Sequence, residues 1–229
     1  MKVTYYGHSC FSVEVLDKQL LFDPFISKNE LAKHIDPSSL QPDYILLSHG
    51  HLDHVDDAVA IAKRSGAEII ATFEVTTWME NQGVANIHPM NTGGARRFPF
   101  GRVKLTTANH SSSFPDGSYA GNPVGFVVES TAGNFYYSGD TALTLDMKLI
   151  GEGTKLDFAI LCVGDNFTMG VDDAIIASDF IGCKKVMGVH YDTFPPIKLN
   201  HDDAKAKFAA AGKRLLLLEI GASQDLLVW

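Results

Sequence analysis

Residues 44–54 of the chain read Tyr44-Ile45-Leu46-Leu47-Ser48-His49-Gly50-His51-Leu52-Asp53-His54. The four residues at the start form a compact apolar run, which is typical of a strand buried on both faces. The histidines and the aspartate that follow are all potential metal ligands. His49 and His51 can point to one side of an extended turn and bind one ion, and Asp53 and His54 on the next turn can bind a second. Gly50 is expected to let the backbone turn tightly between the first two histidines.

Three more candidate ligands follow predicted strands elsewhere in the chain. They are His110 after strand 102–107, Asp140 after strand 135–138 and His190 after strand 185–189. Strand ends gather functional side chains on one rim of a packed sheet, so we expect these residues to complete two metal sites. Imidazole suits zinc, with manganese and iron as alternatives, and a carboxylate such as Asp140 can bridge two ions ~3.5–4 Å apart. Two divalent ions in such a centre would ionise water at neutral pH.

The spacing of this histidine cluster resembles the H-x-H-x-D-H hallmark of the metallo-β-lactamase superfamily, which residues 49–54 match at every ligand position. The later candidate ligands also stand in the order of the superfamily's remaining ligands. The resemblance spans nearly the whole chain and implies the αββα sandwich fold, with Asp140 between two metal sites. The first implied site consists of His49, His51 and His110, and the second of Asp53, His54 and His190.

Three other stretches look like one branch of this superfamily, the predicted metal-dependent hydrolases related to L-ascorbate-6-phosphate lactonase. They are Tyr6-Gly7-His8-Ser9-Cys10-Phe11, Asp23-Pro24-Phe25 and Gly164-Asp165-Asn166-Phe167-Thr168-Met169-Gly170. Secreted β-lactamases of the superfamily often have a cysteine ligand at the second metal, which this chain lacks. Its resemblance is therefore to the cytoplasmic esterase, lactonase and phosphodiesterase relatives, and antibiotic hydrolysis is not expected.

The hydrophobic pattern predicts an α/β (α+β) fold, a four-layer αββα sandwich of two mixed β-sheets that forms one domain over residues 1–229. Strands are predicted at 3–6, 11–15, 19–22, 44–47, 68–72, 102–107, 124–129, 135–138, 158–163, 185–189, 215–218 and 226–229. Helices are predicted at 56–65, 172–181 and 202–211. Because strands this apolar need cover on both faces, the helices are expected on the outside of the two sheets.

The composition excludes several classes of protein. Hydrophobic residues make up 45% of the chain and charged residues 20%, which is enough apolar material for a core without disulfides. Cys10, Cys162 and Cys183 are therefore expected to be buried free thiols. The net charge of -8 argues against a nucleic-acid partner. No apolar run approaches the ~18 residues of a membrane span, so we expect a cytoplasmic protein with no membrane partner. The sequence does not decide whether the protein forms a homo-oligomer.

The predicted activity is metal-dependent hydrolysis of a small-molecule ester, lactone, amide or phosphoester. A hydroxide that bridges the two ions would attack the substrate, Asp140 would hold the ions together, and Asp53 would either hold the nucleophile or relay a proton. The net positive charge of the centre favours an anionic transition state, and an anionic substrate is an option. A di-iron or di-manganese redox protein and a non-catalytic metal-binding regulatory protein are the alternatives.

The sequence leaves two alternative roles for each of three further residues. His8 either orients a ligand or polarises the substrate, or it is a buried histidine with a structural hydrogen bond. Asp165 and Asn166 follow strand 158–163 and either reach the substrate rim or only form a turn. The loops 111–119 and 191–196 follow candidate ligands directly, so we expect them to contribute to the rim of the substrate site.

Overall fold

The computed structural model describes residues 1–229, and its strands form two seven-stranded sheets. In spatial order, the first sheet contains β14 (Ser223–Asp225), β1 (Lys2–Gly7), β2 (Cys10–Val15), β3 (Lys18–Phe22), β4 (Tyr44–Leu46), β5 (Glu68–Thr72) and β6 (Ile87–Met90). The second contains β13 (Arg214–Leu216), β12 (Lys185–Val189), β11 (Phe158–Cys162), β10 (Gly133–Tyr137), β9 (Val124–Ser130), β8 (Gly101–Thr107) and β7 (Ala95–Phe98). Each sheet is mixed, because four neighbouring strands pair in parallel and the others pair antiparallel.

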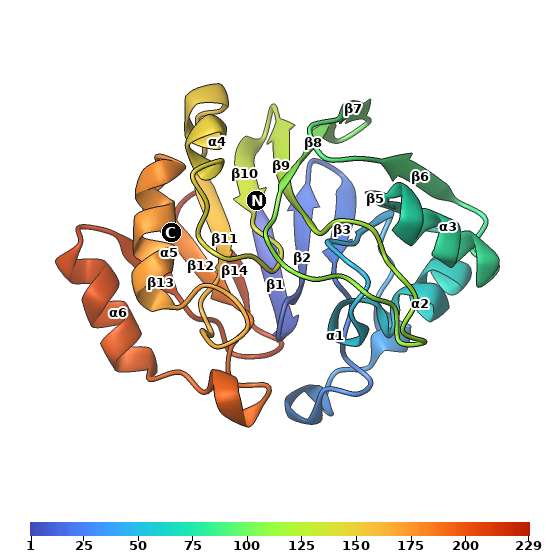
Figure 1. Ribbon diagram of the computed structural model, residues 1–229, viewed down its shortest axis with the longest axis horizontal. Helices are drawn as coiled ribbons and strands as arrows, with labels where there is room; N and C mark the ends of the chain where they lie inside the picture. Colours follow the sequence, from blue (N-terminus) through green and yellow to red (C-terminus); the bar gives the residue numbers. More distant parts are fainter.

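The helices lie outside the two sheets. They are α1 (Leu52–Val55), α2 (Ala58–Ser65), α3 (Phe73–Asn81), α4 (Met147–Gly153), α5 (Val171–Phe180) and α6 (His201–Ala210), and the loops contain three short 3-10 helices, Glu30–Ala32, Pro37–Ser39 and Pro195–Ile197. Figure 1 shows α1, α2 and α3 beside the first sheet and α4, α5 and α6 beside the second. The predicted αββα sandwich of two mixed sheets is therefore confirmed. None of these helices has the length and hydrophobicity that crossing a bilayer requires.

The side chains of β4 explain why this strand is apolar on both faces. Tyr44 and Leu46 belong to the main core between the two sheets, whereas Ile45 and Leu47 belong to a second core beneath the helices on the outer face. Alternate residues of a strand point to opposite faces, so one apolar run serves both cores. Aromatic side chains fill the main core, where the ring of Phe22 lies 4.6 Å from that of Phe11 and 5.6 Å from that of Tyr137.

The parallel parts of the two sheets determine where the polar loops meet. β3, β4 and β5 run parallel in the first sheet, and β10, β11 and β12 run parallel in the second. Parallel neighbours end at the same edge, so the loops that follow them gather there. The segments after β4, β10 and β12 contain the predicted ligands and meet at one rim of the sandwich.

Several sequence predictions need correction. The strand predicted at 226–229 is wrong, because these residues form turns while the polar segment Ser223–Asp225 pairs with β1. Leu226 is fully buried, so the apolar run reflects packing of a turn against the core. The helix predicted at 56–65 begins later, at Ala58, after the separate short helix α1. Helices α3 and α4 were not predicted, since the first is rich in strand-favouring residues and the second contains two glycines. The three cysteines are free and buried, as predicted.

Candidate metal centre

The segment after β4 presents its ligands from a loop and a short helix. His49 is fully buried, and His51 is the residue that precedes α1, whose first and last turns contain Asp53 and His54. We predicted that Gly50 is needed for a tight turn of the backbone. Its φ angle is not in the left-handed region, so the backbone conformation does not require glycine here. A Cβ atom at Gly50 would lie 2.3 Å from the Cβ of Ala120, so the close approach of loop 111–120 requires the absence of a side chain.

His49, His51 and His110 form a cluster that we call the outer group, whose ligand atoms all lie within 4.8 Å of one another. His49 Nε2 lies 2.9 Å from His51 Nδ1. His49 is buried, while His51 and His110 are half-buried at the edge of a cavity. Burial lowers the pKa of all three imidazoles below the usual value for histidine. They are therefore held in the neutral form that binds metals.

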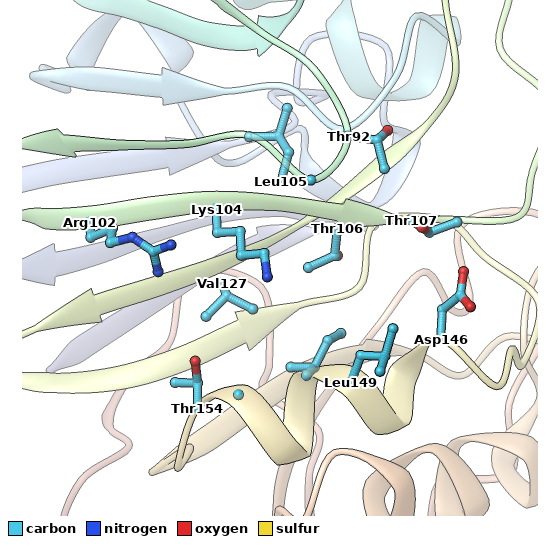
Figure 2. Close-up of a pocket in the computed structure, with 13 residues that line it drawn as sticks. Thr92, Arg102, Lys104, Leu105, Thr106, Thr107, Val127, Asp146, Leu149 and Thr154 are labelled. Atoms are coloured by element: carbon cyan, nitrogen blue, oxygen red, sulfur yellow. The ribbon is translucent and has the colours of Figure 1, made fainter.

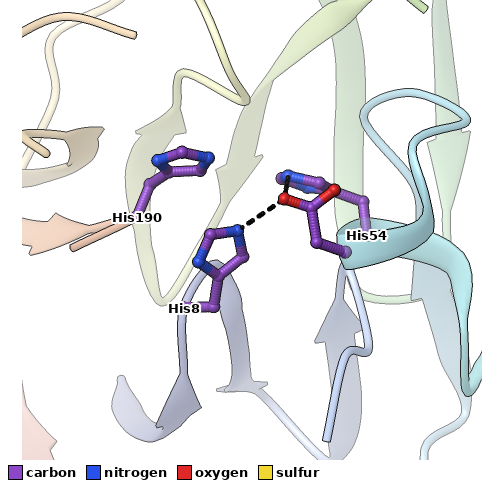
Figure 3. A group of neighbouring side chains, drawn as sticks. His8, His54 and His190 are labelled. Atoms are coloured by element: carbon purple, nitrogen blue, oxygen red, sulfur yellow. Dashed lines mark hydrogen bonds and ion pairs between the residues drawn. The ribbon is translucent and has the colours of Figure 1, made fainter. Parts of the chain in front are cut away.

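His8, Asp53, His54 and His190 form the inner group, whose ligand atoms also lie within 4.8 Å of one another. Figure 3 shows the imidazoles of His8, His54 and His190 arranged around a common space. The ring of His8 lies 4.2 Å from that of His190 and 5.5 Å from that of His54. The three histidines are buried, and the side chain of Asp53 is 25% exposed. The structure thus brings together both sets of ligands that the resemblance implied, and it adds His8 to the second.

Asp140 lies between the two groups. Its Oδ2 atom is 2.9 Å from His190 Nε2 and 3.2 Å from His54 Nε2, both in the inner group, and 3.8 Å from His110 Nε2 in the outer group. Asp140 is 2% exposed. Burial alone would raise its pKa, but the neighbouring His190 and His54 hold the pKa of this carboxyl well below its usual range. Asp140 is therefore an ionised carboxylate within reach of both groups.

Asp23 is a residue that sequence reasoning did not include among the candidate site residues. This fully buried carboxylate follows β3 and accepts hydrogen bonds from His54 Nδ1 at 2.8 Å, Tyr137 OH at 2.6 Å and Ser48 Oγ at 2.6 Å. A carboxylate that accepts the Nδ1 proton of a histidine fixes the ring so that Nε2 faces the metal. The signal in the sequence was an acidic residue directly after β3. This strand pairs in parallel with β4, so the residues that follow the two strands lie at the same edge of the sheet.

His8 is hydrogen-bonded through both ring nitrogens. Its Nε2 lies 3.0 Å from Asp53 Oδ2, and its Nδ1 lies 3.0 Å from Thr193 Oγ1. Burial, together with the adjacent His190, lowers the pKa of His8 to about 4. A neutral imidazole that donates from Nε2 to the Asp53 carboxylate accepts the Thr193 hydroxyl hydrogen at Nδ1. His8 therefore fixes the orientation of Asp53 and links it to the loop after His190.

Charges in the inner group compensate one another. Burial by itself would lower the pKa of His54, but the carboxylates of Asp140 and Asp23 raise it well above the usual value. Burial would raise the pKa of Asp53, whereas the hydrogen bond from His8 and the charge of His54 lower it below its usual range. Without a cation, His54 is protonated between two carboxylates, and a cation that binds there would displace this proton.

Three buried side-chain atoms indicate that the donor set fits a metal. His54 Nε2, Asp140 Oδ1 and His190 Nδ1 are buried and make no hydrogen bond, although His54 Nε2 lies 3.2 Å from Asp140 Oδ2. Buried polar atoms are nearly always satisfied in proteins, so nitrogen and oxygen atoms without a hydrogen bond at this centre need another partner. Imidazole nitrogens combined with carboxylate oxygens are the donor set of zinc and related divalent ions.

A cavity of about 590 Å³ opens above both groups. Ser111, Phe194 and Pro196 line it, so both loops that the sequence predicted as rim contribute to it. The structure does not bring Asp165 or Asn166 to this cavity. Both are exposed, both have positive φ, and the backbone N–H of Asn166 donates to Asp165 Oδ1 within a turn. Asp165 and Asn166 thus lie in a turn, and the next residue, Phe167, lines the cavity.

A second cavity lies away from the histidines. It has a volume of about 330 Å³ and is lined by residues of β8, β9 and α4, among them Arg102, Lys104 and Leu149. Figure 2 shows these side chains and no histidine among them. Because no candidate metal ligand lines this second cavity, the chemistry of the molecule is to be sought at the first.

Comparison with known proteins identifies relatives over the whole chain. A family model described as "Beta-lactamase superfamily domain" matches residues 18–191. A "UPF0173 metal-dependent hydrolase" of Christiangramia forsetii is 54% identical over 227 residues, which cover 99% of this chain and 100% of the relative. YtkL of Bacillus subtilis, also named a metal-dependent hydrolase, is 46% identical and covers 86% of this chain and 88% of its own. The solved structure of Igni18, a metallo hydrolase from Ignicoccus hospitalis, is 31% identical, with a TM-score of 0.85 and 97% of each chain covered.

Proposed function

The chain belongs to the metallo-β-lactamase superfamily, and from this premise we propose that it is a metal-dependent hydrolase with two divalent cations in its active site. One observation carries this proposal. Seven histidine and aspartate side chains from four separate segments converge beneath an open cavity, and three of their buried side-chain atoms make no hydrogen bond. The relatives named metal-dependent hydrolases cover nearly the same length of chain, which supports the same activity here.

We assign the ligands by group. His49, His51 and His110 would hold one cation, and Asp53, His54 and His190 the other, with Asp140 reaching both. Zinc fits this nitrogen-rich set best. When bound, two such cations lower the pKa of water toward ~7 and withdraw electron density from a substrate carbonyl or phosphoryl oxygen.

Asp53 is the residue we assign to proton handling. Its Oδ2 atom is held by His8 Nε2 at 3.0 Å, and its side chain is partly exposed at the cavity. The carboxylate is ionised, so it can accept a hydrogen bond from an attacking water molecule, hold it toward the substrate and pass its proton to the leaving oxygen as the bond breaks. His8 fixes the carboxylate in one orientation for this role. The substrates that suit this arrangement are small esters, lactones and phosphoesters that enter through the cavity.

Metal analysis combined with hydrolysis assays tests the proposal. We expect purified protein to contain close to two equivalents of divalent metal, and to hydrolyse at least one member of an ester, lactone and phosphodiester panel. Prolonged chelation should abolish this activity and added zinc should restore it. His49→Ala should lose activity and part of the metal, while His34→Ala, at an exposed histidine that does not line the cavity, should behave as wild type. Full activity in chelated, metal-free protein would refute the proposal.

A further inference from the structure

The cavity above the candidate metal centre has a polar floor and an apolar wall. The floor consists of His51, Asp53, His110, Asp140 and His190. The wall consists of Phe25, Leu52, Phe167, Phe194 and Pro196, with Lys28 and Ser111 as its polar members. A substrate atom that reaches the floor therefore leaves the rest of the molecule against mainly apolar side chains. The volume of about 590 Å³ suits a small molecule of more than one ring.

Two large apolar side chains of this wall remain exposed. Leu52 is 40% exposed and Phe167 is 53% exposed, and both line the cavity. The turn that presents Phe167 is strained, because Asp165 and Asn166 before it have φ values of +61° and +56°. Left-handed conformations of residues other than glycine cost energy and persist where the surroundings impose them, often at binding sites. The backbone N–H of Asp165 donates to the Met169 carbonyl at 3.1 Å, which closes the turn.

Phe194 extends the apolar wall on the other side of the cavity. Its ring lies 5.4 Å from that of His8 and 6.5 Å from that of Phe25, in edge and tilted arrangements. The ring therefore packs against the inner group while it also lines the cavity. A further aromatic ring that enters the cavity can therefore form a favourable edge-to-face or offset-stacked pair with the cavity-lining side of Phe194.

The wall offers no free positive charge. Its one cationic residue is Lys28, whose Nζ atom lies 2.6 Å from Asp56 Oδ1. The Lys28 side chain is 60% exposed and that of Asp56 is 12% exposed, so the ammonium group lies at the surface with a carboxylate as its close partner. An anionic substituent on the substrate would compete with this carboxylate for Lys28.

We infer that the substrate is an uncharged carboxylic ester or lactone with an aromatic or similarly bulky apolar group next to the scissile acyl bond. This inference rests on the proposed function and narrows it, since a charged group away from the scissile bond, as in a phosphorylated lactone, meets no free positive charge on the wall. In the reaction, water adds its oxygen to the acyl carbon and the bond to the ester oxygen breaks. One proton of the water goes to the leaving alcohol, and the other is released with the carboxylate.

Three methyl esters test this inference with the metal-loaded protein, with proton release as the signal. They are methyl phenylacetate, methyl acetate and methyl 4-carboxyphenylacetate, which is an anion at neutral pH. We expect kcat/KM for the phenylacetate to exceed that for the acetate by at least about tenfold, because the phenyl ring leaves water for the apolar wall. The anionic ester should be at least about tenfold poorer than the neutral phenylacetate. Equal or better turnover of the anionic ester would overturn the inference.

A substitution in the wall makes the test specific to these residues. Phe167→Ala should reduce the ratio of kcat/KM between methyl phenylacetate and methyl acetate by about fivefold, since it removes one ring contact. Leu149→Ala is the matched control, because Leu149 is 65% exposed and lies on α4 outside this cavity. An unchanged ratio in Phe167→Ala would count against the assigned wall.

Binding separates a failure of this inference from a failure of the proposed function. Saturation-transfer NMR with 2-phenylethanol and ethanol needs no turnover. We expect transfer to the phenyl ring in the wild type and a clear loss in Phe167→Ala. If the ring binds in this way and no ester is hydrolysed, the inferred wall stands and the hydrolase proposal fails. If esters are hydrolysed without a preference for the ring and 2-phenylethanol does not bind, the hydrolase proposal stands and the inference fails.

Discussion

The outer and inner groups of candidate ligands share one rim of the sandwich but differ in burial and in charge. The outer group consists of neutral imidazoles, two of them half-buried, and its hydrogen-bond partners outside the group are the serine hydroxyls Ser48 Oγ and Ser111 Oγ. The inner group is mostly buried and contains or contacts three carboxylates, Asp53, Asp140 and Asp23. Two groups with the same kind of ligand are therefore supported in different ways.

This difference shows how much of a metal site can be ordered before a metal binds. In the inner group, carboxylates hold imidazoles in place, so little rearrangement is needed when a cation replaces the proton of His54. In the outer group, His51 faces the cavity with a long contact of 3.4 Å to Ser111, and a cation would contribute most of the ordering. We expect the inner group to bind metal more tightly than the outer group.

Removal of the carboxylate that reaches both groups should have the largest effect. Asp140→Ala should lower turnover by at least about 10³-fold and reduce the metal content of both groups, because each loses a charged ligand. Elemental analysis and hydrolysis assays on folded protein would measure this. Asp173→Ala is the matched control, at an exposed aspartate of α5 with no ion-pair partner. Retention of full metal content in Asp140→Ala would show that Asp140 does not join the groups.

A smaller effect is expected from Asp23→Asn. It should be larger in the inner group, because Asp23 contacts His54 directly and reaches His49 of the outer group only through Ser48. The amide can replace the carboxylate in size, but it accepts the His54 Nδ1 proton more weakly, so metal affinity should fall by about 10–100-fold. Competition with a chromophoric chelator would resolve the two metals. Asp57→Asn is the control, since Asp57 is also buried and accepts backbone hydrogen bonds from Ile26 and Ser27 at 2.7 and 2.9 Å, but contacts no histidine. If Asp57→Asn lost as much metal affinity as Asp23→Asn, the loss could not be assigned to the hydrogen bond between Asp23 and His54.

The stability of the metal-free protein should depend on pH through the buried imidazoles. His8 has a pKa of about 4 in the folded state and about 6.5 when unfolded. Between these values the unfolded state binds more protons, so the free energy of unfolding falls as pH decreases from about 6.5 to 4. His8 contributes about 2.5 kcal/mol to this fall, and His49, His51 and His110, whose pKa values are also lowered, add to it. His54 does not alter this slope, because its raised pKa keeps its contribution fully present below pH 6.5.

Urea unfolding of chelated protein at several pH values would measure this slope. His8→Gln should make it less steep, with the remainder due to His49, His51 and His110, and His34→Gln, at an exposed histidine, should leave it unchanged. Equal stability of the wild type at pH 6.5 and pH 4 would mean that these imidazoles are accessible to protons in the folded state. In that case the inner group would not be more enclosed than the outer group.

The smallest effect is expected at the hydroxyl beside the outer group. Ser111→Ala should change kcat/KM by less than about threefold, because the contact of Ser111 Oγ with His51 Nε2 is long and exposed. Steady-state kinetics with the best substrate of the panel would show it. A loss as large as that of Asp23→Asn would mean that the outer group depends on its hydrogen bonds as much as the inner group does.

The strands and the ligands differ in how well sequence patterns predict them. β4 could be predicted because its apolar run is local, and His49 to His54 because their spacing is local. Helix α3 could not, since its valine, threonines and aromatic residues favour a strand until contacts with β5 and β6 decide otherwise. The strand predicted at 226–229 was wrong for a similar reason: Leu226, Leu227 and Trp229 are apolar because they pack against the core, and they pair with no strand.

The sequence by itself determined the fold class, the chemistry of the ligands and the segments that supply them, because periodicity and residue type are properties of short stretches of chain. Only the tertiary structure decided which ligands meet, that Asp23 supports His54 and His8 supports Asp53, and that Phe167 rather than Asp165 lines the cavity. The two supporting pairs join residues 31 and 45 positions apart, the ligands that meet come from still more distant segments, and all of them depend on the register and angle of packed strands. Distances of this kind arise from the close packing of the whole core, which no local pattern records.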